Sequence, residues 1–126
     1  VEDVGFTFEA MGRLPGPLIK WFLEELGVAG LCNLADGLEH RKAQVSIVYA
    51  LHDGTEVHFF EHHVHGSIAP EPRGSFGFGW NAVFIPDGVD KTYAEMTDDE
   101  VRPYSVRALA IEKIKAYLDT KETSQP

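Results

Sequence analysis

Three widely separated side chains of this 126-residue chain are of types that could handle a phosphorylated ligand. Asp3 lies close to a glycine at an expected strand end, where its carboxylate could hold Mg²⁺ or orient a water molecule. Lys20 interrupts an otherwise apolar helix and could reach a phosphate. Arg107 lies near the start of another expected helix and could make two fixed hydrogen bonds to a carbonyl-bearing base or to a phosphate. Each has an ordinary alternative: a solvated carboxylate, a lysine whose stem packs while its ammonium stays in water, and a partner for a surface carboxylate.

An aromatic segment at residues 76–81, with the sequence FGFGWN, is a fourth candidate. Its glycines would let the backbone approach a planar ligand while an aromatic face stacks on that ligand. Asn81 offers both a donor and an acceptor, as recognition of a base edge requires. The same pattern also fits a core strand whose glycines make close backbone contacts, so both interpretations stay open.

Histidines at 58, 62, 63 and 65 are a fifth candidate, for a zinc site. In a strand, His63 and His65 share one face while His58 and His62 share the other. No three of them would reach one metal ion without a bulge, and no cysteine lies nearby. We therefore interpret the cluster as part of an exposed edge strand that binds Ni²⁺ or Zn²⁺ only adventitiously.

Periodicity and turn residues predict the elements that must position these side chains. Apolar spacing predicts a short buried helix ending at Gly27 and a second one over residues 28–35. Alternation from Ala43 predicts a strand, and Asp53-Gly54 predicts a hairpin turn into a return strand with a possible bulge near Phe59. The remaining expected elements are an aromatic strand over residues 76–85, a capping box at residues 97–100 and a last helix over residues 106–118.

Composition limits the classes of partner. The net charge of -9 makes a long polyanion such as DNA or RNA an improbable main partner, whereas a small phosphorylated ligand with a divalent cation is compatible with it. Cys32 is the only cysteine, so no intramolecular disulfide can form. The sequence has no run of apolar residues long enough to cross a bilayer, and we expect a cytoplasmic protein without membrane contacts. We expect one domain over residues 1–120 and a disordered tail at residues 121–126.

Several short motifs, in order along nearly the whole chain, resemble the inosine triphosphate pyrophosphatase family. These motifs are Val1-Glu2-Asp3, Leu14-Pro15-Gly16-Pro17, Ile19-Lys20-Trp21-Phe22, Phe78-Gly79-Trp80, Pro86-Asp87-Gly88, residues 91–96, and Ser105 with Arg107-Ala108-Leu109. The family hydrolyses non-standard purine nucleoside triphosphates, such as those of inosine and xanthosine, to the monophosphate and pyrophosphate with Mg²⁺. The resemblance implies an α/β (mixed α+β) fold that lacks the family's N-terminal third. It further implies a mixed twisted sheet, a long β-hairpin, flanking helices and a homodimer or larger homo-oligomer.

The resemblance also implies roles for individual residues. Asp3 corresponds to the catalytic aspartate near the metal ion and the α-phosphate, and Lys20 to a lysine that contacts the phosphates. The family's segment around the purine base is matched here by Phe78, Gly79, Trp80 and Asn81. Arg107 corresponds to the family's arginine that hydrogen-bonds the purine 6-oxo group.

Some positions depart from the family. Asn81 replaces an expected acid, Val106 an expected histidine, and Val101 an expected lysine, although Arg102 is next to it. The phosphate-binding loop and the metal-binding glutamate of the family are not among these 126 residues. Two hypotheses follow: a nucleoside triphosphate pyrophosphatase, or a remnant that binds purine nucleotides or serves in oligomerisation without hydrolysis.

Overall fold

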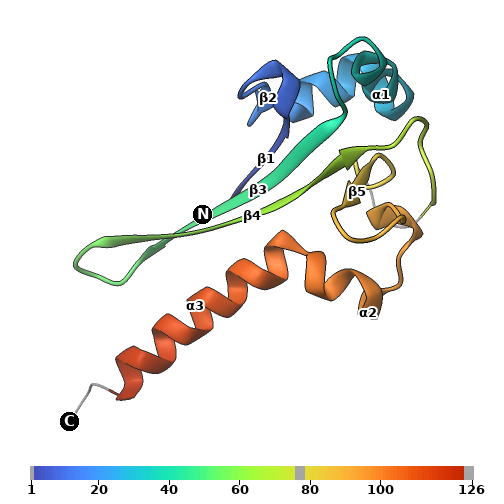
Figure 1. Cartoon of the computed structure of the whole chain (residues 1–126). Coiled ribbons are helices and arrows are strands. Elements are labelled where there is room, and N and C mark those ends of the chain that lie inside the picture. The colour runs from blue at the N-terminus through green and yellow to red at the C-terminus, as the bar shows by residue number, and fades with distance from the viewer. Residues whose placement is uncertain (1, 76–78, 124–126) are drawn as a thin grey trace.

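The computed structural model describes residues 2–75 and 79–123, with side chains through residue 120. Five strands form one sheet in the order β2-β1-β3-β4-β5 (Figure 1). The strands are β1 (Glu2–Phe8), β2 (Pro15–Gly16), β3 (Lys42–His52), β4 (Val57–Ile68) and β5 (Phe84–Pro86). The helices are α1 (Ile19–Asp36), α2 (Asp98–Val101) and α3 (Val106–Thr123), with short 3-10 turns η1 (Glu9–Met11), η2 (Tyr93–Glu95) and η3 (Arg102–Tyr104).

All four strand pairings among the described residues are antiparallel, so the expectation of a mixed sheet is wrong for this part of the chain. A parallel pair needs a crossover, usually a helix, between two neighbouring strands. Here α1 connects β2 to β3, which are not neighbours in the sheet. The expected long hairpin and flanking helices are confirmed.

The β3–β4 hairpin dominates the molecule. Its strands pair in one unbroken register from Lys42↔Ser67 to His52↔Val57, joined by residues 53–56. Phe59 pairs directly with Ala50, so the bulge considered near Phe59 is absent from this hairpin. β5 pairs only with the last three residues of β4, so residues 57–65 have a strand on one side only, as expected for an edge.

Helix α1 contains the break that the sequence predicts at Gly27. Its φ of 68° and ψ of 175° are non-helical, and they separate a first helical segment from a second one that ends at Gly37. Residues with a Cβ rarely adopt this backbone conformation, whereas glycine adopts it readily. The predicted pair of helices is therefore confirmed, with glycine setting the angle between them.

The aromatic strand is shorter than predicted. β5 begins only at Phe84, because Gly79 has a positive φ of 63° and Val83 donates a backbone hydrogen bond back to Trp80 (3.0 Å), which closes a turn. Residues 76–78 lie outside the described part of the chain.

Helix α3 starts where the sequence predicts. The Ser105 hydroxyl accepts a hydrogen bond from the Ala108 N–H (3.2 Å) and so caps the helix. The helix continues to Thr123, beyond the expected end at Leu118 and three residues into the expected tail. The capping box of Thr97 and Glu100 at α2 is also confirmed.

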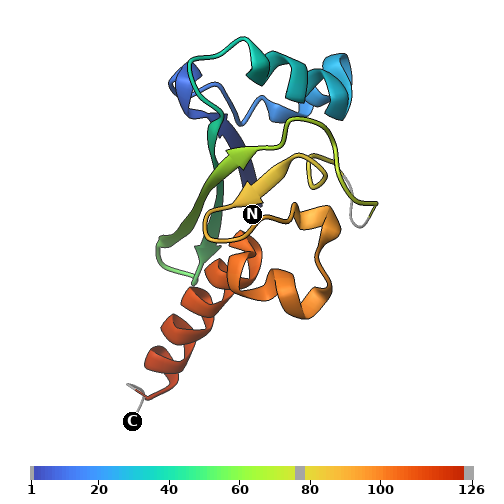
Figure 2. The same ribbon diagram turned by 45° about the vertical axis from the view of Figure 1, so that its right-hand side comes forward.

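One face of the sheet carries the core, as the alternating burial of β1 and β3 shows. Phe6 and Phe8 of β1 and Val45 of β3 are buried there, under α1, the loops after β5 and the start of α3 (Figures 1 and 2). Cys32 of α1 is buried in the same cluster, and its carbonyl accepts a hydrogen bond from Arg41 (3.3 Å). In the described part of the chain, no helix has the length and apolar character that a membrane span requires.

Candidate functional site

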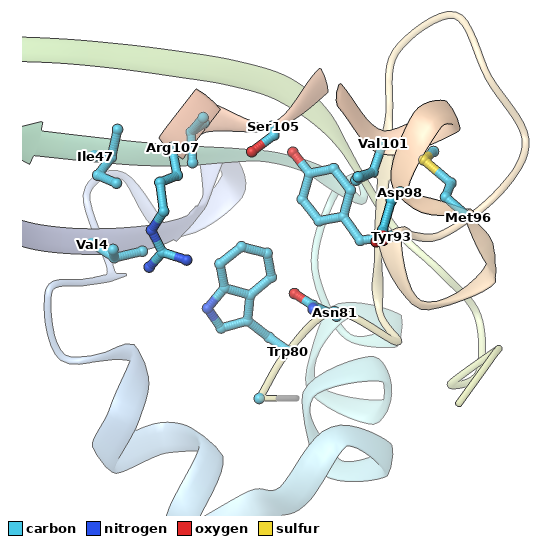
Figure 3. Close-up of a pocket in the computed structure, with 12 residues that line it drawn as sticks. Val4, Ile47, Trp80, Asn81, Tyr93, Met96, Asp98, Val101, Ser105 and Arg107 are labelled. Carbon is cyan, nitrogen blue, oxygen red and sulfur yellow. The ribbon is translucent and has the colours of Figure 1, made fainter. Parts of the chain in front are cut away.

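A cavity of about 470 Å³ lies at the covered face of the sheet, between the turn before β5 and the start of α3 (Figure 3). Val4 of β1 and Ile47 of β3, which pair across the sheet, contribute apolar wall. The other lining residues come from the turns and loops between β4 and α3, from α2 and from α3: Gly79, Trp80, Asn81, Tyr93, Met96, Asp98, Val101, Ser105, Val106 and Arg107. Four of the residues that the sequence singles out, Gly79, Trp80, Asn81 and Arg107, are thus brought together.

The Trp80 ring is held by other aromatic rings. Its centroid lies 5.0 Å from that of Phe6 and 6.0 Å from that of Tyr93, while the half-buried indole still borders the cavity (Figure 3). The Tyr93 hydroxyl donates to the Tyr104 carbonyl (2.6 Å), and burial raises the pKa of that phenol. Asn81 is fixed through its backbone carbonyl, which accepts from the Ala94 N–H (3.1 Å). The aromatic wall is therefore rigid enough to stack on a planar ligand.

Arg107 is anchored by a carboxylate from the first strand. Its Nη2 donates to Glu2 Oε1 (2.7 Å) and its Nε to Glu2 Oε2 (3.2 Å). Tyr49 of β3 also donates its hydroxyl to Glu2 Oε2 (2.7 Å). The Arg107 guanidinium, and next the Tyr49 hydroxyl, hold the pKa of Glu2 below its usual value, and Glu2 in turn raises the pKa of Arg107.

The anchoring pair leaves donors for a ligand. A guanidinium has five N–H groups. The hydrogen bonds to Glu2 use Nε and Nη2, and Figure 3 shows the guanidinium of Arg107 near the Trp80 ring. The ordinary alternative for Arg107, pairing with a carboxylate, is therefore confirmed, and this pairing orients the side chain.

Sequence reasoning missed Glu2 and Tyr49 as partners of Arg107. Glu2 is 105 positions from Arg107, and no local motif links them. The available signal was the strand period, since Glu2 and Val4 share a face of β1.

Asp3 and Lys20 do not line this cavity. Asp3 lies on β1 between Glu2, which bonds α3, and Val4, which lines the cavity, so its exposed side chain is on the other face of the sheet. Lys20 is exposed on α1, with its Nζ 5.8 Å from the Trp21 ring centroid. Phe78 lies outside the described residues.

Asp3 offers an exposed carboxylate on the face of the sheet opposite the cavity, whereas Asp98 is the carboxylate that lines the cavity. Among the described residues Asp3 makes no ion pair, whereas the neighbouring Glu2 is engaged by Arg107. Mg²⁺ commonly binds one or two carboxylates, substrate phosphates and water. One exposed carboxylate oxygen donor is therefore a suitable protein ligand for Mg²⁺, provided that a polyphosphate supplies further oxygens.

Comparison with known proteins confirms the resemblance. An inosine triphosphate pyrophosphatase of Schizosaccharomyces pombe is 41% identical over 97% of this chain and 65% of its own length. A dITP/XTP pyrophosphatase of Hyperthermus butylicus is 41% identical over 94% of this chain and 62% of its length. The solved Ham1 protein of Staphylococcus aureus superimposes with a TM-score of 0.80 at 25% identity, over 95% of this chain and 66% of that one.

The chain thus spans less than two thirds of the length of these two curated relatives. The model of the Ham1 family matches residues 1–117, nearly the whole described chain. Since both the sequence model and the fold agree over this length, the chain belongs to the Ham1 family.

Proposed function

We propose that this chain acts in the hydrolysis of non-standard purine nucleoside triphosphates to the monophosphate and pyrophosphate, and that its cavity binds the purine base. The names of the relatives support the reaction class. The observation that carries the assignment to this cavity is the convergence of Trp80, Asn81 and Arg107 on one apolar-walled space.

Base recognition follows from the geometry of Arg107. Glu2 fixes the edge of the guanidinium formed by Nε and Nη2, so Nη1 can donate to a carbonyl oxygen of a base lying near Trp80. Inosine and xanthosine present such a carbonyl at position 6, where adenine presents an amino group. A donor facing a donor leaves both unpaired, which disfavours adenine.

Two departures from the family change the chemistry of the cavity. Asn81 brings a neutral amide with both donor and acceptor in place of a charge. Val106 is buried and apolar. We therefore assign the reading of the base carbonyl chiefly to Arg107.

The phosphates would extend from the cavity toward α1. A Cβ at Gly79 would lie 3.8 Å from Leu23, so α1 borders the aromatic turn. Lys20 is three residues before Leu23 and shares its side of the helix, where its ammonium can neutralise a phosphate. β1 has no described strand on its outer side at Asp3, so the polyphosphate would have to pass this edge of the sheet for Mg²⁺ held by Asp3 to stabilise the charge on the leaving pyrophosphate.

Pyrophosphate release tests the reaction. The chain is incubated with Mg²⁺ and, in turn, the triphosphates of inosine, xanthosine, guanosine and adenosine. We expect turnover of the inosine and xanthosine substrates above that of the adenosine substrate. No turnover of any of them at high protein concentration would contradict hydrolysis by the chain on its own.

A second candidate is nucleotide binding without hydrolysis. It is favoured by the observation that the base-side residues share the cavity whereas Asp3 and Lys20 do not line it. Calorimetry with inosine monophosphate distinguishes the two: heat of binding without turnover supports the second candidate. No heat at millimolar ligand would contradict base binding altogether.

A further inference from the structure

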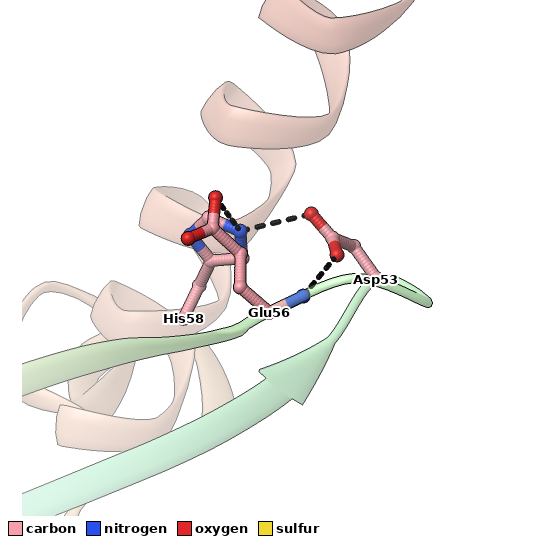
Figure 4. Close-up of side chains that lie close together, drawn as sticks. All are labelled: Asp53, Glu56 and His58. Carbon is pink, nitrogen blue, oxygen red and sulfur yellow. Dashed lines mark hydrogen bonds and ion pairs between the residues drawn. The ribbon is translucent and has the colours of Figure 1, made fainter.

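A cluster at the hairpin turn is separate from the nucleotide cavity and shares no residue with it. Asp53 and Glu56 lie in the connection between β3 and β4, and His58 is the second residue of β4 (Figure 4). One ligand atom from each of the three lies within 4.8 Å of the other two. His58 Nε2 is 2.9 Å from Asp53 Oδ2 and 3.8 Å from Glu56 Oε1.

The two carboxylate oxygens of Asp53 are used differently. Oδ1 accepts hydrogen bonds from the N–H groups of Thr55 (2.9 Å) and Glu56 (3.0 Å), which shapes the turn. Oδ2 faces the imidazole of His58 instead. The turn needs only the backbone of Glu56, so its carboxylate near His58 has no part in forming the turn.

A fourth oxygen comes from a different element. The Tyr117 hydroxyl of α3 lies 3.0 Å from His58 Nε2 and 3.3 Å from Asp53 Oδ2, and its ring centroid is 4.8 Å from that of His58. A nitrogen and three oxygens from two separate parts of the chain therefore surround one point. The Asp53 side chain is 11% exposed and that of His58 27%, whereas that of Glu56 is 74% exposed, so this point is shielded on the side of Asp53 and open to water on the side of Glu56.

We propose that Asp53, Glu56 and His58 form a site for a divalent transition-metal cation of the Zn²⁺ or Co²⁺ type. An imidazole nitrogen with two carboxylates suits these ions better than Mg²⁺ or Ca²⁺, which prefer oxygen ligands alone. The two carboxylates and a neutral imidazole carry two negative charges, which a divalent cation neutralises. The cation would accept the lone pair of His58 Nε2, so the imidazole binds as the neutral tautomer with its proton on Nδ1, and positions remain open for water.

The site differs from the one that the histidine pattern suggested. His58 and His62 face α3, as the contacts of His58 with Tyr117 and the influence of Lys113 on His62 show, whereas His63 and His65 are exposed. The strand period separates the histidines, as predicted. The ligands that join His58 come from the turn, and a bound cation would tie the hairpin end to α3 through the groups around Tyr117.

Calorimetric titration of the chain with Zn²⁺, and the visible absorption of the Co²⁺ form, test this proposal. We expect one cation per chain and a rise of the thermal midpoint with Zn²⁺. His58→Gln should abolish both effects. Glu56→Gln should weaken binding about tenfold or more while the turn folds normally, because the Glu56 side chain is 74% exposed.

His63→Gln is the matched control. His63 Nε2 also lies 3.8 Å from a glutamate, Glu61, but no second carboxylate joins that pair among the described residues. The His63→Gln variant should therefore bind Zn²⁺ with the same affinity as the parent chain. No binding by the parent at millimolar Zn²⁺, undiminished binding by His58→Gln, or a loss in His63→Gln as large as in His58→Gln would overturn the proposal.

Discussion

At the scale of single residues, the guanidinium of Arg107 lies between a carboxylate of its own chain and the space proposed for a base. Glu2 lies on the opposite end of the sequence but next to Arg107 in space. The pair fixes the orientation of a long, flexible side chain before any ligand binds. Such preorganisation lowers the entropy lost on binding.

Arg107→Ala should therefore remove discrimination between bases. A hydrogen bond from a charged group contributes about 1.5–3 kcal/mol, so the Kd for inosine monophosphate should rise roughly tenfold to 150-fold. The Kd for adenosine monophosphate should change little. Calorimetry measures both, and Arg102→Ala, which removes an exposed arginine outside the cavity, is the control. Equal losses for both nucleotides would contradict a role in reading the carbonyl.

Glu2→Gln should change how stability depends on pH. The pKa of Glu2 is held below 4.5 in the folded chain, first by Arg107 and then by Tyr49. A carboxyl with a lowered folded pKa stabilises the fold above its unfolded pKa, and this contribution is lost as the pH falls through the folded pKa. The free energy of unfolding should therefore be lower for Glu2→Gln than for the parent at neutral pH, and the difference should shrink below pH 4.5.

Urea unfolding over this pH range measures that difference. Glu24→Gln, which removes an exposed carboxylate of α1 without an ion pair to any described residue, is the matched control and should show no such dependence. A constant difference between Glu2→Gln and the parent at all pH values would contradict the argument.

At the scale of elements, Gly27 determines how the two segments of α1 meet. Gly27→Ala should destabilise the chain by about 1–3 kcal/mol, because its backbone conformation strains any residue with a Cβ. No steric clash would add to this cost, since nothing lies within 4 Å of a Cβ built there. Urea unfolding measures the change.

Gly37→Ala is the control for this prediction. Gly37 has an ordinary helical φ of -87°, and a Cβ there would lie 3.7 Å from the carbonyl oxygen of Leu34, so alanine should be neutral or slightly stabilising. Similar losses in both variants would contradict the conformational argument.

Local pattern was sufficient to predict most elements but not their assembly. Alternation from Ala43 and the turn at Asp53 predict the hairpin because both signals lie within one short stretch. Ser105 predicts the start of α3 for the same reason. The antiparallel pairing of β1 with β3 joins residues such as Val4 and Ile47, which local pattern does not relate.

The candidate site was predicted only in part, because local pattern identifies residue types but not which distant residues become neighbours. The base-side residues Trp80, Asn81 and Arg107 were identified by type and resemblance, and the cavity unites them. The network of Glu2 and Tyr49 was not predicted, because it depends on which strands become neighbours. Likewise, Asp53 and Glu56 join His58 only once the turn has folded.

At the scale of the whole molecule, the sheet is covered on one face, while the other carries Val57 and Phe59 of the hairpin, with exposed fractions of 49% and 70%. Exposed apolar groups beside an unpaired strand edge favour association. We therefore expect a homodimer or larger assembly through this outer hairpin surface, formed by Val57 and Phe59.

Sedimentation should give a mass above 14.0 kDa for the chain. Phe59→Ser should shift the population toward monomer, whereas Leu26→Ser, which changes a 44% exposed residue on α1, should not. A mass of 14.0 kDa at high concentration would contradict this expectation.

The single cysteine provides an intrinsic probe of opening motions. Cys32 is 1% exposed in α1, so the fold keeps alkylating reagents away from its thiol. Burial also raises the pKa of the thiol, which lowers the fraction of reactive thiolate. Labelling then requires α1 to separate from the sheet, and its rate reports how often that happens. The packing stability of α1 can thus be followed in the unmodified sequence, with and without added nucleotide, by mass spectrometry alone.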